Sequence, residues 1–406
     1  MDMSRRWAWN GASTAATPDR RSFKDHCHRI RETAEACFAG WSHAYEHALV
    51  RMSGGLDSTI AASLLQRAGA AKITGFHFNS PGYEGYEDKL ARQAARDFGI
   101  DLIERDLPRG AVDLTGILNA PRMARPNRQV MGVHADEQVR AVCDDLHIDA
   151  VMTGHGGDAL FLQRSLTQSI LSDNMRLHGI GRRTWNAAYE TAMLLEEPVW
   201  QILRRAMREG VKRRVNRLET AQTLAGNIPD CLVKPEALVD LGANDLHHPW
   251  LIELDDLPPT KWLQLDSVIA LRNYQPLIGN ALARPAINPW ISQPIMEFSL
   301  STPAPVFVEG GLDRALERDA FRDIIPNDIA RRTLKGFVNN GLLTTISHNL
   351  PFIRELVLDG ELVAQPWLDR AKAETMLTEE AMATGLVLPP IINLVVTEAW
   401  LHAWRG

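Results

Sequence analysis

A short run of glycine, serine and aspartate at residues 53–58 holds the side chains best suited to chemistry in this chain. It follows the apolar residues 48–50 and precedes an apolar, helix-like segment, so it occupies a strand-to-helix junction. Glycines at such a junction let backbone N–H groups close around an anion, and the helix N-terminus adds the positive end of its dipole. The alternative is an ordinary serine-capped Gly-Gly turn. The pattern predicts a phosphate-binding loop, with the members Ser53, Gly54, Gly55, Leu56, Asp57 and Ser58.

The loop also contains hydroxyl and carboxylate groups at useful positions. Ser53 and Ser58 can donate to phosphate oxygens, and the Asp57 carboxylate can hold a Mg²⁺ that bridges those oxygens. The chain contains no Gly-x-x-x-x-Gly-Lys-Ser/Thr sequence, so this is not a loop that cradles a γ-phosphate with a lysine. It resembles the pyrophosphate loop of enzymes that cleave ATP between the α- and β-phosphates and leave AMP and pyrophosphate.

A second loop of the same layout lies at residues 148–161, where an apolar strand, a glycine-rich turn and Asp158 follow one another. In a doubly wound parallel sheet, turns at the carboxyl ends of strands face one crevice. We therefore expect Asp57 and Asp158 to share one Mg²⁺. The turn also fits a Gly-x-Gly-x-x-Ala dinucleotide fingerprint, but that interpretation needs a following strand with an acidic residue, and the sequence continues as arginine-rich helix.

The elements around these loops predict an α/β fold, a doubly wound parallel sheet followed by a large helical C-terminal part. We expect a nucleotide-binding core over residues 46–165, a helical N-terminal extension over 1–45 and a mostly helical region over 166–406 that completes the substrate pocket. Helical spacing covers residues 26–48, and an amphipathic helix at 391–404 carries two tryptophans that we expect in the core. The alternating strands and helices of the core are expected at 49–52, 59–68, 72–78, 86–98, 101–104, 136–146 and 150–153.

Composition limits the function classes. The hydrophobic content of 45% and the charged content of 23% are typical of a globular chain, and the net charge of −6 argues against nucleic acid as the main partner. The four cysteines lack metal-site spacing, and no apolar stretch is long enough to span a membrane. We expect a cytoplasmic protein with no membrane or nucleic-acid partner. A basic run at 208–217 is expected to be a solvated helix face, with a docking surface for an acidic peptide as the alternative.

The two loops together resemble the synthetase domain of the asparagine synthetase family, which pairs Ser-Gly-Gly-x-Asp-Ser with Ser/Thr-Gly-x-Gly-x-Asp-x-Leu-Phe. Here the second motif runs from Thr153 through Gly154 and Asp158 to Phe161. The resemblance implies ATP and Mg²⁺ as cofactors and activation of a carboxylate by adenylation. It also implies nucleotide contacts at Gly154 and at Phe78, the end of a strand that borders the adenine.

Two residues are expected to take part in the reaction itself. Lys335 resembles the catalytic lysine of the family, where it would supply charge to the α-phosphate from a mobile, glycine- and asparagine-flanked loop. His155 stands where the family usually has an acidic residue, and an imidazole can accept a proton from the attacking amine. The alternative for His155 is a contact with the substrate alone. Ala159 also departs from relatives that carry glutamate there.

Two further patterns resemble one subgroup, the lasso-peptide cyclases. They are residues 289–297, where Ser-Gln-Pro replaces the usual aspartate, and Gln163 in a Phe-x-Gln ending of the second loop. The resemblance implies that an Asp or Glu side chain of a ribosomal precursor peptide is adenylated and closed onto the peptide's N-terminal amine. It also implies a leader-binding protein and a leader peptidase as partners.

Other members of the superfamily remain as alternatives. The main one is a ligase that amidates a small-molecule carboxylate with ammonia or a free amine. A tRNA-modifying enzyme would need a basic surface and paired catalytic cysteines, and a non-catalytic scaffold is expected to lack Asp57, Asp158 or Lys335. Asp2 follows Met1 where glutamine-dependent relatives expose a cysteine, so we expect no ammonia-releasing half.

Overall fold

The computed structural model describes most of the chain. The described residues are 9–79, 85–106, 112–119, 122–123, 125–211, 232–234, 237, 248–252, 257–271, 284–332, 339–365, 367–383 and 387–405.

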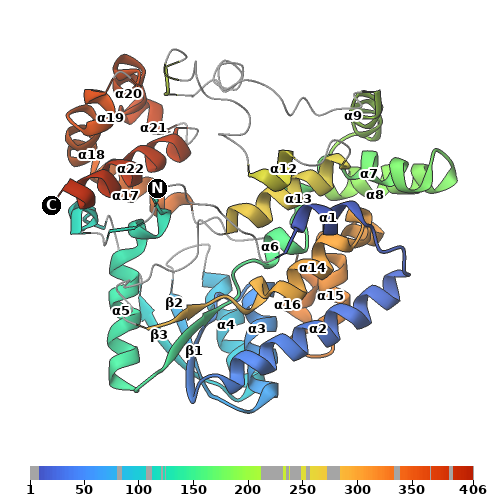
Figure 1. Ribbon diagram of the computed structural model, residues 1–406. Helices are drawn as coiled ribbons and strands as arrows, with labels where there is room; N and C mark the ends of the chain where they lie inside the picture. Colours follow the sequence, from blue (N-terminus) through green and yellow to red (C-terminus); the bar gives the residue numbers. More distant parts are fainter. Residues whose placement is uncertain are drawn as a thin grey trace.

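Five parallel strands form one sheet with the order β3-β2-β1-β4-β5 (Figure 1). The first three strands in the sequence extend the sheet in one direction from β1, and the last two extend it in the other. The direction therefore reverses between β1 and β4, and in sheets of this kind the crevice at that point binds ligands. The strands are β1 (His47–Arg51), β2 (Lys72–Asn79), β3 (Asp101–Asp106), β4 (Ala150–Thr153) and β5 (Ala286–Ile287).

Helices cover both faces of the sheet, as the sequence predicted (Figure 1). Alternate residues of β1 point to opposite faces: Ala48 and Val50 join the main core, whereas Leu49 packs against α5 together with Val151 of β4. Such two-sided burial explains why the strands read as continuous apolar runs. The flanking helices are α2 (Phe23–His43), α3 (Leu56–Ala68) and α4 (Gly85–Phe98) with the main core, and α5 (Val133–Asp145) on the other face.

The expected helix over residues 26–48 is wrong at its end. The helix α2 stops at His43, and the backbone N–H groups of Glu46 and His47 donate to the carboxylate of Asp149, each at 3.0 Å. Ala48 is paired with both β2 and β4. The helix was expected to continue because the apolar residues of this stretch keep a helical period. The contacts that place residues 46–48 in the sheet instead come from residues far along the chain, which the local pattern does not reveal.

The region after the second loop is mostly helical, as predicted, and it forms two smaller cores of its own. One core joins α17–α22 to the 3₁₀ turns η1 and η2. There the indoles of Trp400 and Trp404 both donate to the carbonyl of Met123, although Trp404 stays 53% exposed. The other core joins α7, α8 and α9.

The remaining elements complete the chain order. They are α1 (Gly11–Ala16), η1 (Thr115–Asn119), η2 (Arg128–Gly132), α6 (Gly157–Leu160), η3 (Arg164–Leu166), α7 (Ile170–His178), α8 (Arg182–Leu195), α9 (Val199–Val211), α12 (Pro249–Ile252), α13 (Pro259–Ala270), η6 (Pro289–Ile291), α14 (Gln293–Ser301), η7 (Ala304–Gly311), α15 (Ala315–Phe321), α16 (Asn327–Arg331), α17 (Asn339–His348), α18 (Leu350–Leu358), α19 (Glu361–Ala364), α20 (Arg370–Met376), α21 (Glu379–Ala383) and α22 (Leu388–Arg405). Among the described residues, no helix has the length and apolar character needed to cross a membrane.

Candidate active site

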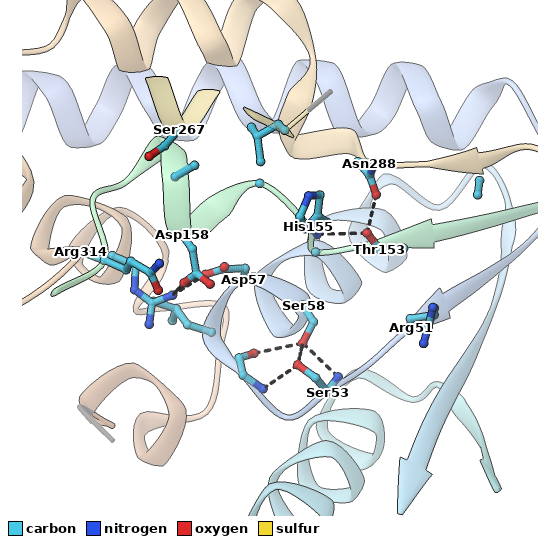
Figure 2. Close-up of a pocket in the computed structure, with 18 of the residues that line it drawn as sticks. Arg51, Ser53, Asp57, Ser58, Thr153, His155, Asp158, Ser267, Asn288 and Arg314 are labelled. Atoms are coloured by element: carbon cyan, nitrogen blue, oxygen red, sulfur yellow. Dashed lines mark hydrogen bonds and ion pairs between the residues drawn. The ribbon is translucent and has the colours of Figure 1, made fainter. Parts of the chain in front are cut away.

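A pocket of about 900 Å³ opens at the carboxyl ends of β1 and β4, where the sheet order reverses (Figure 2). Both glycine-rich loops line it, and so do residues from the helical region that follow much later in the chain. Sheet topology thus brings together the two motifs that the sequence placed far apart.

The first loop is held open by hydrogen bonds between its own serines. Ser58 Oγ accepts from Ser53 N at 3.1 Å and donates to Gly55 O at 3.2 Å, and the two serine hydroxyls are 3.0 Å apart. The helix α3 begins at Leu56, and its N-cap residue Gly55 has no side chain that could cap the N–H groups of the first turn. Because the helix starts three residues before the expected position 59, Asp57 and Ser58 lie in its first turn. N–H groups of an uncapped first turn are the donors that an anion binds.

Two glycines of the loops are required by their surroundings. Gly54 has φ +77°, and a Cβ there would lie 2.3 Å from the carbonyl oxygen of Glu87 on α4. A Cβ on Gly154 would lie 2.5 Å from both the Cα and the N of Ser58. The two loops therefore contact each other backbone to backbone, and only glycine at position 154 permits that approach.

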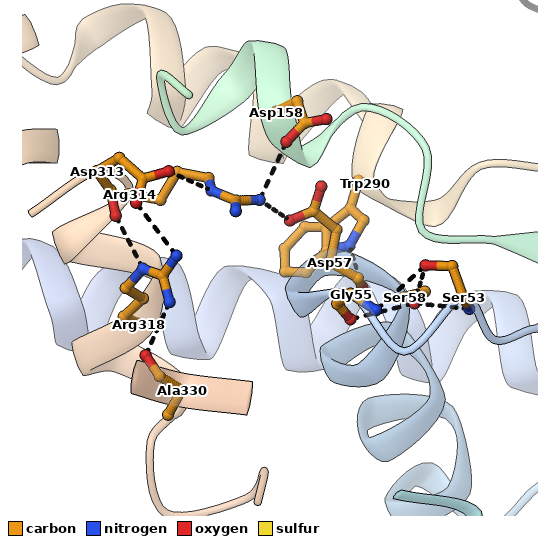
Figure 3. A network of polar contacts seen from close by, with 10 residues as sticks. All are labelled: Ser53, Gly55, Asp57, Ser58, Asp158, Trp290, Asp313, Arg314, Arg318 and Ala330. Atoms are coloured by element: carbon orange, nitrogen blue, oxygen red, sulfur yellow. Dashed lines mark hydrogen bonds and ion pairs between the residues drawn. The ribbon is translucent and has the colours of Figure 1, made fainter. Parts of the chain in front are cut away.

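A guanidinium joins the two predicted metal ligands (Figure 3). Arg314 Nη1 donates to Asp57 Oδ1 at 2.7 Å and to Asp158 Oδ1 at 3.0 Å, and all three side chains are largely buried. Two carboxylates converging on one positive group form a donor set of hard oxygens that also fits Mg²⁺. Asp57 and Asp158 thus lie close together around one guanidinium, and their expected role as ligands of a shared Mg²⁺ stays a prediction.

Further charges surround Arg314 and leave the cluster with excess negative charge. Asp313 accepts from Arg314 Nε at 3.3 Å and from Arg318 Nη2 at 3.2 Å. Glu317 is completely buried, neither of its oxygens has a hydrogen-bond partner among the described residues, and burial raises its pKa well above the usual value. Burial alone would lower the pKa of Arg314, but carboxylates, Asp57 foremost, outweigh it and raise that pKa. Excess carboxylate favours binding of a further cation here.

His155 lies in the second loop and lines the pocket. Its backbone N–H donates to Thr153 Oγ1 at 3.0 Å, and that hydroxyl donates to Asn288 Oδ1 at 2.5 Å (Figure 2). Asn288 follows β5, so the outermost strand of the sheet fixes the turn that carries His155. This placement leaves both expected roles of His155 open.

The other end of the pocket holds a second charge pair. Arg51, the last residue of β1, lies 3.9 Å from Asp136 on α5, and its guanidinium stands over the ring of Phe78 at 5.7 Å. Burial lowers the pKa of Arg51 and raises that of Asp136. Phe78 itself packs edge-on against Phe76 and supports Arg51. The expected contact of Phe78 with the nucleotide stays a prediction.

A buried polar network supports the second loop from behind. Leu160 O, two residues after Asp158, accepts from Gln264 Nε2 at 2.7 Å and from Ser299 Oγ at 2.6 Å. Lys261 Nζ donates to Gln264 Oε1 at 2.5 Å and is fully buried. Burial lowers the pKa of this lysine to about 7. The network ties α13 and α14 to the turn that presents Asp158.

The contacts of several site residues were not predicted from the sequence. Trp290 Nε1 donates to the carbonyl of Asp57 at 3.1 Å, so the motif at 289–297 anchors the phosphate loop. Ser292, in the same motif, accepts from the indole of Trp41 at 2.9 Å and does not line the pocket. The role of Arg314 was also missed, and the signal for it was the clustering of charged residues in an otherwise apolar stretch at 313–318.

Lys335 lies outside the described residues. The chain reaches the pocket just before it, since Arg332 lines the pocket and donates to Glu87 at 2.7 Å. Asn339, which was expected in the loop around Lys335, is the first residue of α17. The position of Lys335 in the site stays a prediction.

The comparison with known families agrees with this geometry. The chain matches the family described as asparagine synthase over residues 31–404. It belongs to the asparagine synthase family. Membership identifies an ATP-dependent ligase that forms carbon–nitrogen bonds, in a family that typically uses ATP with Mg²⁺. No curated protein matches the chain.

Proposed function

We propose that this member of the family adenylates an Asp or Glu side chain of a ribosomal precursor peptide, releases pyrophosphate, and closes a macrolactam with the peptide's N-terminal amine. The observation that carries the AMP-forming chemistry is the meeting of Asp57 and Asp158 beside the uncapped first turn of α3. This arrangement suits a pyrophosphate group that leaves from the α-phosphate.

Each part of the first half-reaction has a candidate group. The N–H groups and hydroxyls of loop 53–58 bind and orient the pyrophosphate, and Arg314 places positive charge beside it. A Mg²⁺ held by Asp57 and Asp158 would neutralise charge on the leaving group. Lys335 is proposed to close over the α-phosphate from the segment that follows Arg332.

The second half-reaction needs a place for an acyl group and an amine. The pocket of about 900 Å³ lies at the upper end of the usual range of about 300–1,000 Å³ for ligand pockets, so it has room beyond a nucleotide. His155, Gln163 and Ser267 line it together with Asn288. We assign His155 to accept the proton of the attacking amine. Holding the peptide prefolded would supply the proximity that ring closure needs.

The peptide substrate rests on the resemblance of residues 289–297 and Gln163 to lasso-peptide cyclases. A leader-binding protein and a leader peptidase are accordingly proposed as partners, and the cytoplasm as the location.

The test incubates the purified protein with ATP, Mg²⁺, a candidate precursor peptide and its leader peptidase, and measures product mass and nucleotides. A core peptide lighter by one water, with AMP and pyrophosphate formed in equal amounts, supports the proposal. The matched control is Asp158→Asn, which keeps the shape of the side chain and removes its charge. ATP cleavage that requires a small acid and an amine, with no effect of peptide, overturns the peptide assignment in favour of the small-molecule amide ligase.

A further inference from the structure

The helix α8 carries three large apolar side chains on its solvent-exposed face. Trp185, Tyr189 and Met193, spaced four residues apart, are 63%, 62% and 63% exposed. The buried face is built mainly of small residues, namely Thr184, Ala188, Thr191 and Ala192 together with Leu194. A surface helix normally buries its large apolar side chains and exposes polar ones.

The neighbouring helix α9 repeats this arrangement. Trp200 and Met207 are 70% and 58% exposed, whereas Ile202 and Ala206 are buried in the core shared with α7 and α8. With Ile180, the segment from 180 to 207 holds six of the eleven exposed large apolar side chains in the described part of the chain. The inner faces of the two helices already form a packed core with α7, so the exposed apolar side chains do not contribute to that core. Apolar patches of this kind mark interaction sites.

Both helices also carry arginines. Arg182 and Arg183 stand in the first turn of α8, which contains no acidic residue, so their charges oppose the helix dipole. Arg204 and Arg208 stand one turn apart on α9 and repel each other, although the helix dipole favours a positive charge in the last turn, where Arg208 lies. No ion pair joins any of the four to another described residue. An acidic occupant would relieve both unfavourable arrangements.

The helix α9 is attached close to the pocket wall. Arg205 Nη1 donates to the carbonyl of Gln168 at 3.1 Å, two residues after Leu166, which lines the pocket. Figure 1 shows α8 and α9 at the outer end of the molecule next to α7, the helix that follows this wall. Arg164, between the lining residues Gln163 and Leu166, donates to Leu195 O at the end of α8 at 3.0 Å, so both helices are joined to this wall of the pocket.

We propose that the outer faces of α8 and α9, called here the hairpin surface, dock an acidic, apolar-bearing segment of the peptide substrate. The hairpin surface consists of Arg182, Arg183, Trp185, Tyr189, Met193, Trp200, Arg204, Met207 and Arg208. This inference rests on the proposed peptide substrate. A polypeptide fits better than a membrane because Arg204 lies between Trp200 and Met207 within the apolar stripe, whereas membrane-surface helices keep cations at the border of a continuous apolar face.

The test compares two hairpin variants, Trp185→Ser/Trp200→Ser and Arg204→Glu/Arg208→Glu, with the wild type. The matched control is Trp367→Ser, which removes a tryptophan that is 52% exposed elsewhere on the surface. We expect KM and Kd for the fluorescein-labelled precursor peptide to rise about 30-fold in each hairpin variant, as for loss of interface hot spots. kcat at saturating peptide and KM for ATP should stay unchanged, and the control should behave as wild type.

A second arm uses the precursor peptide with its acidic residues outside the ring replaced by Asn or Gln. This peptide should bind wild type as weakly as the normal peptide binds Arg204→Glu/Arg208→Glu. If wild type closes the peptide and the hairpin variants keep its KM, the docking surface is refuted while the proposed function stands. If wild type turns over only small acids, both fail. Binding of wild type, but not the hairpin variants, to vesicles of anionic lipid would assign the surface to a membrane and overturn the peptide.

Discussion

Replacing Gly154 with alanine tests the claim that the two acidic loops work as one unit. The new Cβ would lie 2.5 Å from the Cα and N of Ser58 and 2.8 Å from the carbonyl carbon of Asp57. Carbon atoms pack at about 3.5 Å or more, so the loops must separate by about 1 Å. Backbone atoms cannot rotate away as a side chain does, and the separation moves Asp57 relative to Asp158.

A misplacement of about 1 Å in an active site costs about 100-fold in rate. We therefore expect Gly154→Ala to lose about 100-fold in kcat/KM for carboxylate-dependent exchange of labelled pyrophosphate into ATP. Overpacking should lower the free energy of unfolding by only about 1–3 kcal/mol, so the protein stays folded. Binding of an ATP analogue with a non-cleavable α–β bridge, measured with Mg²⁺ by calorimetry, should weaken in parallel.

The matched control is Gly40→Ala in α2. A Cβ there meets nothing within 4 Å, and alanine is favoured over glycine in a helix by about 1 kcal/mol. This variant should keep full activity and unfold at a slightly higher temperature. Exchange and analogue binding within twofold of wild type in Gly154→Ala would refute the view that loop contact sets the positions of the two aspartates.

Three further predictions concern single charged residues. Arg314→Gln leaves buried carboxylates unpaired, so its free energy of unfolding in EDTA should be about 3–5 kcal/mol lower than that of wild type. Mg²⁺ should raise the melting temperature of this variant more than that of wild type. Equal shifts in melting temperature would contradict a cation site between the aspartates. Burial lowers the pKa of Lys261 from 10.5 to about 7. Between these two pH values the unfolded chain binds more protons than the folded protein does, so the free energy of unfolding of wild type should rise with pH across that window. Lys261→Met should lack this rise when melting temperatures are compared from about pH 7 to 10. Lys335→Ala should keep its affinity for the ATP analogue but lose pyrophosphate exchange, and an unchanged exchange rate would make Lys335 a surface residue.

Much of the fold followed from local patterns. Strands and helices of the core lie close to their expected positions, because apolar periodicity and glycine-rich turns act over a few residues. The beginning of α3 was placed three residues late, since Thr59 looks like a helix start whereas Gly55 is the N-cap. The end of α2 was missed because hydrogen bonds to Asp149, distant in sequence, stop the helix.

The sequence by itself determined the turns of the two loops and the carboxylate that each turn presents. Glycine, serine and aspartate at fixed spacing after a strand specify these features through local backbone geometry, whereas the anion site stays a prediction. Tertiary structure alone decided that Arg314 joins Asp57 and Asp158, because long-range packing of α15 delivers that guanidinium. It also decided that Trp185 faces outward: helical periodicity defines the faces of a helix, but the neighbours that pack against it determine which face is buried.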